Sequence, residues 1–327
     1  METDAFYLDR TVRLEGGTLV AERKLDGRDH YLHQHLVDGV PTMPGVFVTE
    51  IAAQAARRLV PQGVVTGFRD LVLDRFLRLG GGSDRAPLRV RATLRSGAAG
   101  RSVVDVVVTM DVVAPSGQVL VRDRRHFSVT VLVDARRPAA PTWPAWPTAD
   151  ELPVPDPYLT PGSPVRVDGA FVSTTGLRLH PLGARARYTA PAGAGSVFDR
   201  FTVPVLLLDG LLRLIGTELV DDRYVPIFAP TRIRRIDLHV GGGDVVLGGA
   251  GAVELFATPR AAALLGAEGG TRALAVDGTG RVLVQIKDVV GVGVGGFDTV
   301  AGRQVDWPVI GDVGRSRLSG RVGVVPL

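Results

Sequence analysis

The residue pattern best suited to chemistry in this chain is His35-Leu-Val-Asp-Gly39-Val-Pro-Thr-Met-Pro44-Gly45, directly before an expected helix over 46–60. A histidine held beside the free N–H groups of a helix N-terminus can do acid–base work on a carbonyl compound. Pro44 can fix the approach of the chain, while Gly45 lets a ligand come close to the backbone. The pattern therefore predicts a proton-transfer site around His35.

Other motifs with chemical meaning are weaker. His30, His33 and His35 fall within six residues, but their spacing fits no zinc pattern well and no carboxylate recurs at a ligand spacing, so we expect no metal. The glycine-rich stretch 291–296 follows an expected strand, but no amphipathic helix comes after it, so it does not indicate a dinucleotide site. The lack of a Gly-x-Ser-x-Gly elbow disfavours a serine hydrolase.

Composition indicates a globular chain of one large or two ordinary domains. Of the 327 residues 45% are apolar, and the absence of cysteine excludes disulfides, thiolate metal sites and a cysteine nucleophile. No apolar run reaches transmembrane length and the N-terminus lacks a signal pattern. We therefore expect a cytoplasmic protein that does not contact a membrane.

The net charge of +4 is carried mostly by arginine. Six arginines lie in strand-like segments: Arg122, Arg124, Arg125, Arg232, Arg234 and Arg235. They form either solvated strand faces or a docking surface for an acidic partner. A nucleic acid is not expected, because aromatic residues are only 6% of the chain and none interleave with these arginines.

The chain divides into two similar halves. Residues 136–165 are rich in proline and predict a stiff extended linker between an N-terminal half, 1–135, and a C-terminal half, 166–327. In each half short strands precede one helix, and further strands follow it. Expected strands in the first half cover 12–24, 88–95, 103–113 and 118–133; in the second half they cover 177–190, 233–240, 245–257 and 272–294.

The two expected helices, 46–60 and 203–220, carry matching apolar stripes. One stripe is Val48, Ile51, Ala52, Ala55 and Leu59; the other is Leu208, Leu211, Leu212, Ile215 and Leu219. A helix with such a stripe, followed by an antiparallel meander, suits a curved sheet wrapped around one helix. Two copies side by side predict an α+β pseudo-dimer within one chain.

The motif His35-x-x-x-Gly39-x-x-x-x-Pro44 resembles the signature of the dehydratase domains of type I polyketide synthases and polyunsaturated fatty acid synthases. The stretch from Met43 to Gln54 is also similar to the single-hotdog dehydratases of fatty acid synthesis. This resemblance implies a double hotdog, with two antiparallel sheets each wrapped around a central helix. It covers most of the chain.

The segment Val203-Pro-Val-Leu-Leu-Leu-Asp209-Gly-Leu-Leu-Arg213 resembles the part of these domains that carries the catalytic aspartate. By resemblance, His35 removes the α-proton of a β-hydroxyacyl thioester and Asp209 protonates the leaving β-hydroxyl. The same resemblance assigns the thioester carbonyl to the N–H of Gly39, with Pro44 and Gly45 lining the substrate. The implied activity is that of a hydro-lyase.

One site is expected rather than two. Glu50 and Asp209 occupy equivalent places in the two helices, but the second half has no histidine at the matching place before its helix. Glu50 therefore lacks a partner imidazole, and we interpret it as structural. The working pair would be His35 with Asp209, across the pseudo-twofold.

The chain departs from the family at two places. Arg213 stands where the family usually has glutamine or histidine, so it either pairs with Asp209 or points away, toward a carrier protein or a phosphate. Phe171 lies in a short Asp168-Gly-Ala-Phe segment, where the family tends to have a Tyr/Gly/Pro/Phe-rich motif lining the pocket. We expect Phe171, Arg213 and Gln54 as pocket residues.

Three functions remain open: a dehydratase, a double-bond isomerase or cyclase of the same fold, and a non-catalytic double-hotdog structural domain. The resemblance implies no cofactor, since the thioester is the electron sink and the substrate travels on phosphopantetheine. The implied partners are an acyl carrier protein, other synthase domains and a second copy in a homodimer.

Overall fold

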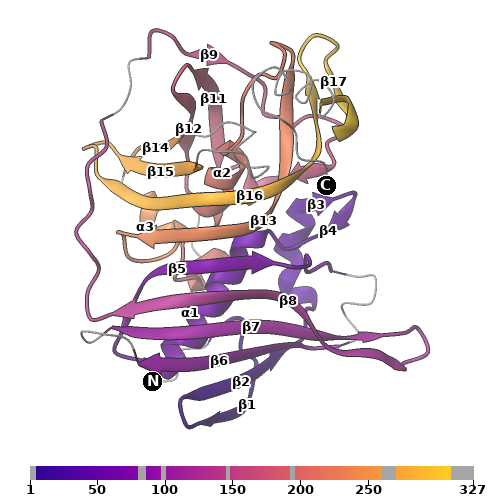
Figure 1. Cartoon of the computed structure of the whole chain (residues 1–327), viewed down its shortest axis with the longest axis vertical. Coiled ribbons are helices and arrows are strands. Elements are labelled where there is room, and N and C mark those ends of the chain that lie inside the picture. Colours follow the sequence, from indigo (N-terminus) through magenta and orange to yellow (C-terminus); the bar gives the residue numbers. More distant parts are fainter. Residues whose placement is uncertain are drawn as a thin grey trace, which may run out of the picture.

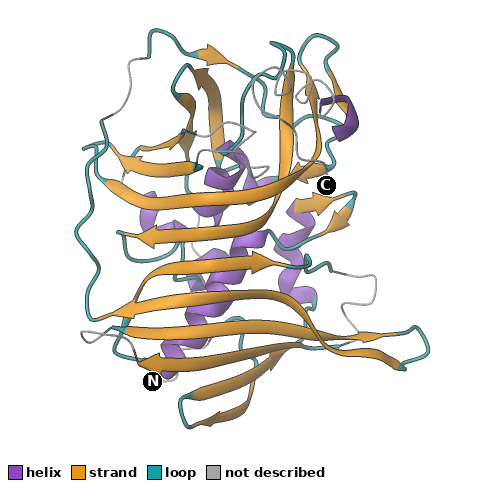
Figure 2. Ribbon diagram, viewed as in Figure 1, coloured by secondary structure: helices purple, strands orange, loops and turns teal. Residues whose placement is uncertain are grey.

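The computed structural model describes residues 5–79, 86–96, 101–144, 148–191, 196–249, 251–258 and 270–310. Two helices, α1 (Val48–Leu59) and α2 (Val205–Leu214), lie on the same side of one large antiparallel sheet (Figures 1 and 2). Helix α1 packs on the strands of the N-terminal half and α2 on those of the C-terminal half. No helix in the described ranges is both long and apolar enough to span a bilayer.

The N-terminal half of the sheet follows the spatial order β1, β2, β6, β7, β8, β5. These strands are β1 (Arg10–Glu15), β2 (Thr18–Arg23), β6 (Leu88–Ser96), β7 (Ser102–Val113), β8 (Val119–Asp134) and β5 (Val64–Leu73). The inward residues of β7 alternate with half-exposed ones, which is the pattern of a sheet with one buried face.

The C-terminal half continues the same sheet in the order β13, β16, β15, β14, β12, β11, β9. These strands are β13 (Tyr224–Leu238), β16 (Val282–Asp298), β15 (Arg272–Asp277), β14 (Val253–Ala257), β12 (Gly183–Tyr188), β11 (Thr174–His180) and β9 (Leu152–Pro153), with β17 (Arg303–Val305) paired to β16. Strands β5 and β13 join the halves, with Phe68 opposite Ile236.

Most residues of the two predicted apolar stripes are buried, although Ile215 and Leu219 lie beyond the end of α2. The side chains of Ile51, Ala52 and Ala55 on α1 have no exposed surface, and Leu208 and Leu211 on α2 are buried as fully. Helix α2 is shorter than the expected 203–220. It ends at Leu214 because the next residue is extended and Gly216 is left-handed, with φ of 78°.

The expected strand over 245–257 is wrong in its first part. Residues 244–248 form a short helix, α3 (Asp244–Gly248), and only β14 is extended. The buried carboxylate of Asp244 accepts hydrogen bonds from the N–H groups of Leu206 at 3.0 Å and Leu207 at 2.9 Å. These contacts cap α2, and the tertiary partner thereby overrides the β-like composition of this segment.

The Pro-rich segment 136–165 is pinned to the C-terminal half. Trp143 donates its main-chain N–H to the carbonyl of Gly280 at 2.8 Å, and its side chain packs against a small apolar cluster that includes Phe256. At its other end the chain forms β10 (Val165–Val167), which pairs with β3 (His35–Val37). The boundaries at 135 and 165 stay a prediction.

Candidate active site

His35 begins β3, which forms a tight hairpin with β4 (Val40–Pro41). Val37 lies opposite Val40, so the loop is the two residues Asp38 and Gly39, with φ of 50° and 76°. Two positive φ values make a type I′ turn, which glycine adopts without strain. Because β10 pairs on the other side, with Val167 opposite His35, the histidine lies in a small three-stranded sheet.

The His35 imidazole is 6% exposed, and its Nδ1 lies 2.7 Å from the carbonyl oxygen of Thr42. Since a carbonyl only accepts, Nδ1 carries the proton and Nε2 holds the basic lone pair. Burial lowers the pKa of His35, while the charge of Asp209 raises it and that of Arg213 lowers it. The ring is therefore neutral at pH 7 and able to accept a proton.

Pro44 and Gly45 lead from this sheet into α1 through a 3₁₀ turn, Gly45–Phe47, and both line a cavity with His35. A Cβ on Gly45 would lie 2.6 Å from Cδ1 of Leu73, so a larger residue would have to push that side chain aside. Gly39 does not line this cavity.

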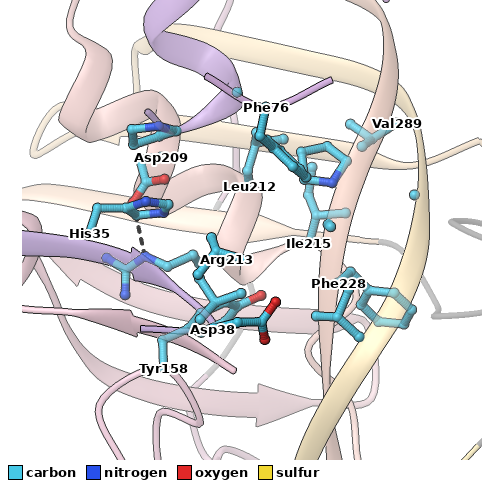
Figure 3. Close-up of a pocket in the computed structure, with 18 of the residues that line it drawn as sticks. His35, Asp38, Phe76, Tyr158, Asp209, Leu212, Arg213, Ile215, Phe228 and Val289 are labelled. Atoms are coloured by element: carbon cyan, nitrogen blue, oxygen red, sulfur yellow. Dashed lines mark hydrogen bonds and ion pairs between the residues drawn. The ribbon is translucent and has the colours of Figure 1, made fainter. Parts of the chain in front are cut away.

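The cavity has a volume of about 210 Å³ and lies between the two halves (Figure 3). His35 and Asp209 line it together, one from β3 and one from α2. Its apolar wall comes from α2, β13 and β16 and includes Leu212, Ile215, Phe228 and Val289. A pocket with an apolar wall and a few converging polar groups is typical of a small-molecule site.

Asp209 and Arg213 lie one turn apart on α2 and form an ion pair, with Nε 3.2 Å from Oδ2. The guanidinium donates further to the carboxylate of Asp156 at 3.2 Å and to the carbonyl of Phe171 at 3.0 Å. It also lies over the ring of Tyr158, 5.7 Å from the centroid. Of the two sequence-based alternatives, the structure has Arg213 paired with Asp209.

The linker supplies residues that sequence reasoning missed. Asp156 holds Arg213, and Tyr158 is buried and lines the cavity. The only local signal is an Asp-Pro-Tyr in a proline-rich stretch, which by itself indicates an extended chain. Phe171 lies behind His35, with ring centroids 5.5 Å apart, and does not itself line the cavity.

Gln54 does not line the cavity. Its Oε1 accepts the N–H of Tyr7 at 2.8 Å, and its Nε2 donates to Glu50 at 2.8 Å, one turn away on α1. Glu50 in turn accepts the N–H groups of Thr202 at 2.9 Å and Val203 at 2.8 Å, directly before α2. Burial raises the pKa of Glu50 to about 7. These contacts give Glu50 and Gln54 a structural place between the two helices.

His30 and His33 are exposed and do not join His35 at the cavity. Among the residues that the structure describes, no group of three or more histidine or acidic side chains is placed to hold a metal ion.

Residues 7–109 match a protein family described as the polyketide synthase dehydratase domain. This stretch contains the whole His35 motif and α1. A search of curated proteins finds no match.

Solved structures match over nearly the whole chain. The dehydratase domain from the CurF module of the curacin polyketide synthase is 15% identical with a TM-score of 0.65, over 88% of this chain and 98% of that one. The PpsC dehydratase domain from Mycobacterium tuberculosis, solved as a variant of one histidine, is 22% identical with a TM-score of 0.61, over 87% and 96%.

The third similar structure is the CurK dehydratase, solved as two inactive mutants. One has a histidine replaced by phenylalanine, with a TM-score of 0.62, and the other an aspartate replaced by asparagine, with a TM-score of 0.63. Each is 15% identical and covers 88% of this chain, with 96% and 98% of the CurK chains covered. The chain thus has the α+β double-hotdog fold, and the predicted resemblance to polyketide synthase dehydratase domains is confirmed.

Proposed function

We propose that this chain, like the dehydratase domains that it resembles, is a hydro-lyase that removes water from a β-hydroxyacyl thioester on an acyl carrier protein. The product is an α,β-unsaturated thioester in polyketide or fatty-acid-like biosynthesis. The observation that carries the proposal is the meeting of His35 and Asp209 in one largely apolar cavity, one residue from each half. The match of residues 7–109 to the dehydratase family supports it.

In this proposal His35 is the base. Its Nδ1 is engaged by the Thr42 carbonyl, so Nε2 accepts the α-proton of the thioester. The lowered pKa keeps the imidazole neutral at physiological pH, which this step requires. We assign the thioester carbonyl to the main-chain N–H of Gly45, where the chain enters the turn before α1, because Gly45 lines the cavity and Gly39 does not.

Asp209 completes the elimination. Its carboxyl proton passes to the β-hydroxyl as the Cβ–O bond breaks, and the electrons of the former Cα–H bond form the double bond. Water then leaves, with one proton gained by His35 and one lost by Asp209. Return of that proton from His35 to Asp209 resets the pair. The CurK structures of inactive mutants, one of a histidine and one of an aspartate, support a two-residue mechanism of this kind.

One observation favours a second candidate, a double-bond isomerase. The Asp209 carboxylate is already engaged by Arg213, with Nε 3.2 Å from Oδ2, rather than free to contact a leaving hydroxyl. If Asp209 only holds Arg213 and takes no part in the chemistry, His35 alone can move a proton between the γ- and α-carbons of an enoyl thioester. No water is then lost.

Neither reaction as proposed requires a metal or redox cofactor, because the thioester carbonyl takes up the developing charge. The proposed partners are an acyl carrier protein, which delivers the substrate on phosphopantetheine, and the neighbouring domains of a synthase. A homodimer and a cytoplasmic location are part of the same proposal.

The test is incubation of the purified chain with a β-hydroxyacyl pantetheine thioester, followed by mass spectrometry. Loss of one water supports the dehydratase, whereas an enoyl thioester converted to an isomer of equal mass supports the isomerase. The His35→Ala variant should lose about 10²–10⁴-fold in kcat. His33→Ala, two residues away and exposed, is the matched control and should keep its activity. A wild-type chain inert toward both substrates would make it a structural domain.

A further inference from the structure

The cavity has an open end and a closed end. Asp38 and Arg78 line one side with side chains that are 69% and 42% exposed, so this side is the mouth. Ile215, Val289 and Phe228 also line it and are at most 9% exposed, so they form the floor. Figure 3 places these three side chains on the far side of the cavity from His35 and Asp209.

The floor is backed by a second aromatic ring. Trp307 packs edge-on against Phe228, with ring centroids 5.4 Å apart. Phe228 lies directly opposite Gly293 in the β13–β16 pairing, so the two positions share one face of the sheet. Trp307 therefore occupies the space where a side chain of Gly293 would stand.

The glycines of β16 leave the space that Trp307 occupies. A Cβ on Gly293 would lie 2.0 Å from the indole of Trp307, and one on Gly296 would lie 2.3 Å from Cδ1 of Ile310. Both Trp307 and Ile310 come from the segment that follows β17, and Ile310 is only 2% exposed. The stretch 291–296, which suits no dinucleotide, is thus the surface on which residues 307–310 pack.

We propose that Trp307, which packs on Gly293, fixes Phe228 as the end of the acyl pocket. This limits the substrates of the protein to short β-hydroxyacyl groups of about four to six carbons. This inference rests on the proposed function and narrows its substrate class. The cavity volume of about 210 Å³ and the buried Phe228 side chain at its floor suit a short acyl group. A longer chain would have to displace Phe228 and the ring behind it.

The experiment compares β-hydroxyacyl pantetheine thioesters of four, six, eight and twelve carbons. With the wild-type chain, kcat/KM should fall by about tenfold or more between six and eight carbons, because even one misfitting methylene costs about tenfold in a closed pocket. In Trp307→Ala the fall should shrink to about threefold or less. Gly293→Ala displaces the same ring from the other side and should have the same effect.

Val309→Ala is the matched control, since Val309 belongs to the same segment and is 45% exposed. It should keep the wild-type length profile. Circular dichroism of every variant checks that its fold is intact. A wild-type profile that is flat from four to twelve carbons, or one that Trp307→Ala and Gly293→Ala both leave unchanged, would overturn the inference.

Binding separates this inference from the proposed function. His35→Ala should hold the same thioesters without turning them over, and their dissociation constants can be measured by calorimetry. If the short chains bind more tightly but the wild type does not dehydrate them, the proposed function is refuted. The inferred limit on acyl length would still hold. Equal binding of all four lengths would refute the limit itself.

Discussion

The guanidinium of Arg213 lies 3.2 Å from the Asp209 carboxylate, and both side chains are more than nine-tenths buried. The same guanidinium is held by Asp156 from the linker, which is 15% exposed. Removing the cation would leave two largely buried carboxylates without their counter-charge. The linker therefore helps to position Asp209, the proposed acid from the C-terminal half, through Arg213.

Replacing Arg213 with glutamine should raise the pKa of His35. The positive charge of Arg213 is one cause of its lowered pKa, so removing that charge stabilises the imidazolium. Since the base must be neutral, the acidic limb of the kcat/KM profile should move to higher pH. The imidazole resonances of His35 in NMR give the same shift independently of activity. Arg166→Gln, at an exposed arginine on β10, is the control, and a limb that stays in place contradicts the prediction.

The Asp156–Arg213 pair should show strong coupling in a double-mutant cycle. Arg213→Gln leaves Asp156 and Asp209 without their counter-charge and should lower the free energy of unfolding by about 1–3 kcal/mol. Asp156→Asn in the same background should recover part of that loss, so the double variant is more stable than the sum of the singles. The free energies of unfolding of the single and double variants are measured in urea.

The exposed pair Arg232–Asp70, 3.1 Å apart against 3.2 Å for Asp156–Arg213, serves as the comparison for that cycle. Both of its side chains are more than half exposed, so its coupling should stay below about 1 kcal/mol. Equal coupling in the two pairs would mean that burial does not strengthen the Asp156–Arg213 interaction.

How far the site could be predicted depended on distance along the chain. The His35 loop is local, since a two-residue turn and a helix start are readable from the order of Asp38, Gly39 and Gly45. Asp156 was not predictable, because its role exists only once the linker lies against α2. Gln54 was expected in the pocket, but it does not line the cavity and is hydrogen-bonded to Glu50, four residues earlier on α1.

Helices and strands with one buried face could be predicted from their apolar pattern. A strand whose residues are set by contact with a neighbouring strand could not. The strand β5 was missed because Gly67, Arg69 and Asp70 interrupt its alternation. A Cβ on Gly67 would lie 2.4 Å from the carbonyl of Ile236, so the glycine is needed for the joining strand β13 to approach. The need for a glycine at position 67 can be seen only once β5 is paired with β13.

Glu50 should make stability depend on pH in the direction opposite to an ordinary paired carboxylate. Its pKa is about 7 in the folded chain and about 4.5 when unfolded, so the folded state binds the proton more tightly. The contribution of this group is complete below pH 4.5 and is lost as the pH rises to 7, on the order of 3 kcal/mol. Glu50→Gln should remove that slope.

The measurement is the free energy of unfolding in urea between pH 4.5 and 8 for the wild type and Glu50→Gln. The free energy of unfolding of the wild type minus that of Glu50→Gln should fall by on the order of 3 kcal/mol as the pH rises, because only the wild type carries a group that loses its proton. Glu15→Gln replaces a carboxylate that is 66% exposed and should leave the slope as in the wild type. A constant difference across the range would show that burial does not control the ionisation of Glu50.

Gly39 should matter through its backbone conformation. Its φ of 76° suits glycine, and no atom lies within 4 Å of an added Cβ, so the cost of Gly39→Ala is backbone strain of about 1–2 kcal/mol. Gly39→Asn should cost less, because asparagine tolerates a type I′ turn. Gly117→Ala strains a turn with φ of 87° in the distant β7–β8 hairpin and is the control. Urea unfolding should show similar losses for the two alanine variants, but only Gly39→Ala should also lower kcat, since it lies in the hairpin that carries His35. Equal kcat in the two alanine variants would show that the turn at Gly39 does not help to position His35.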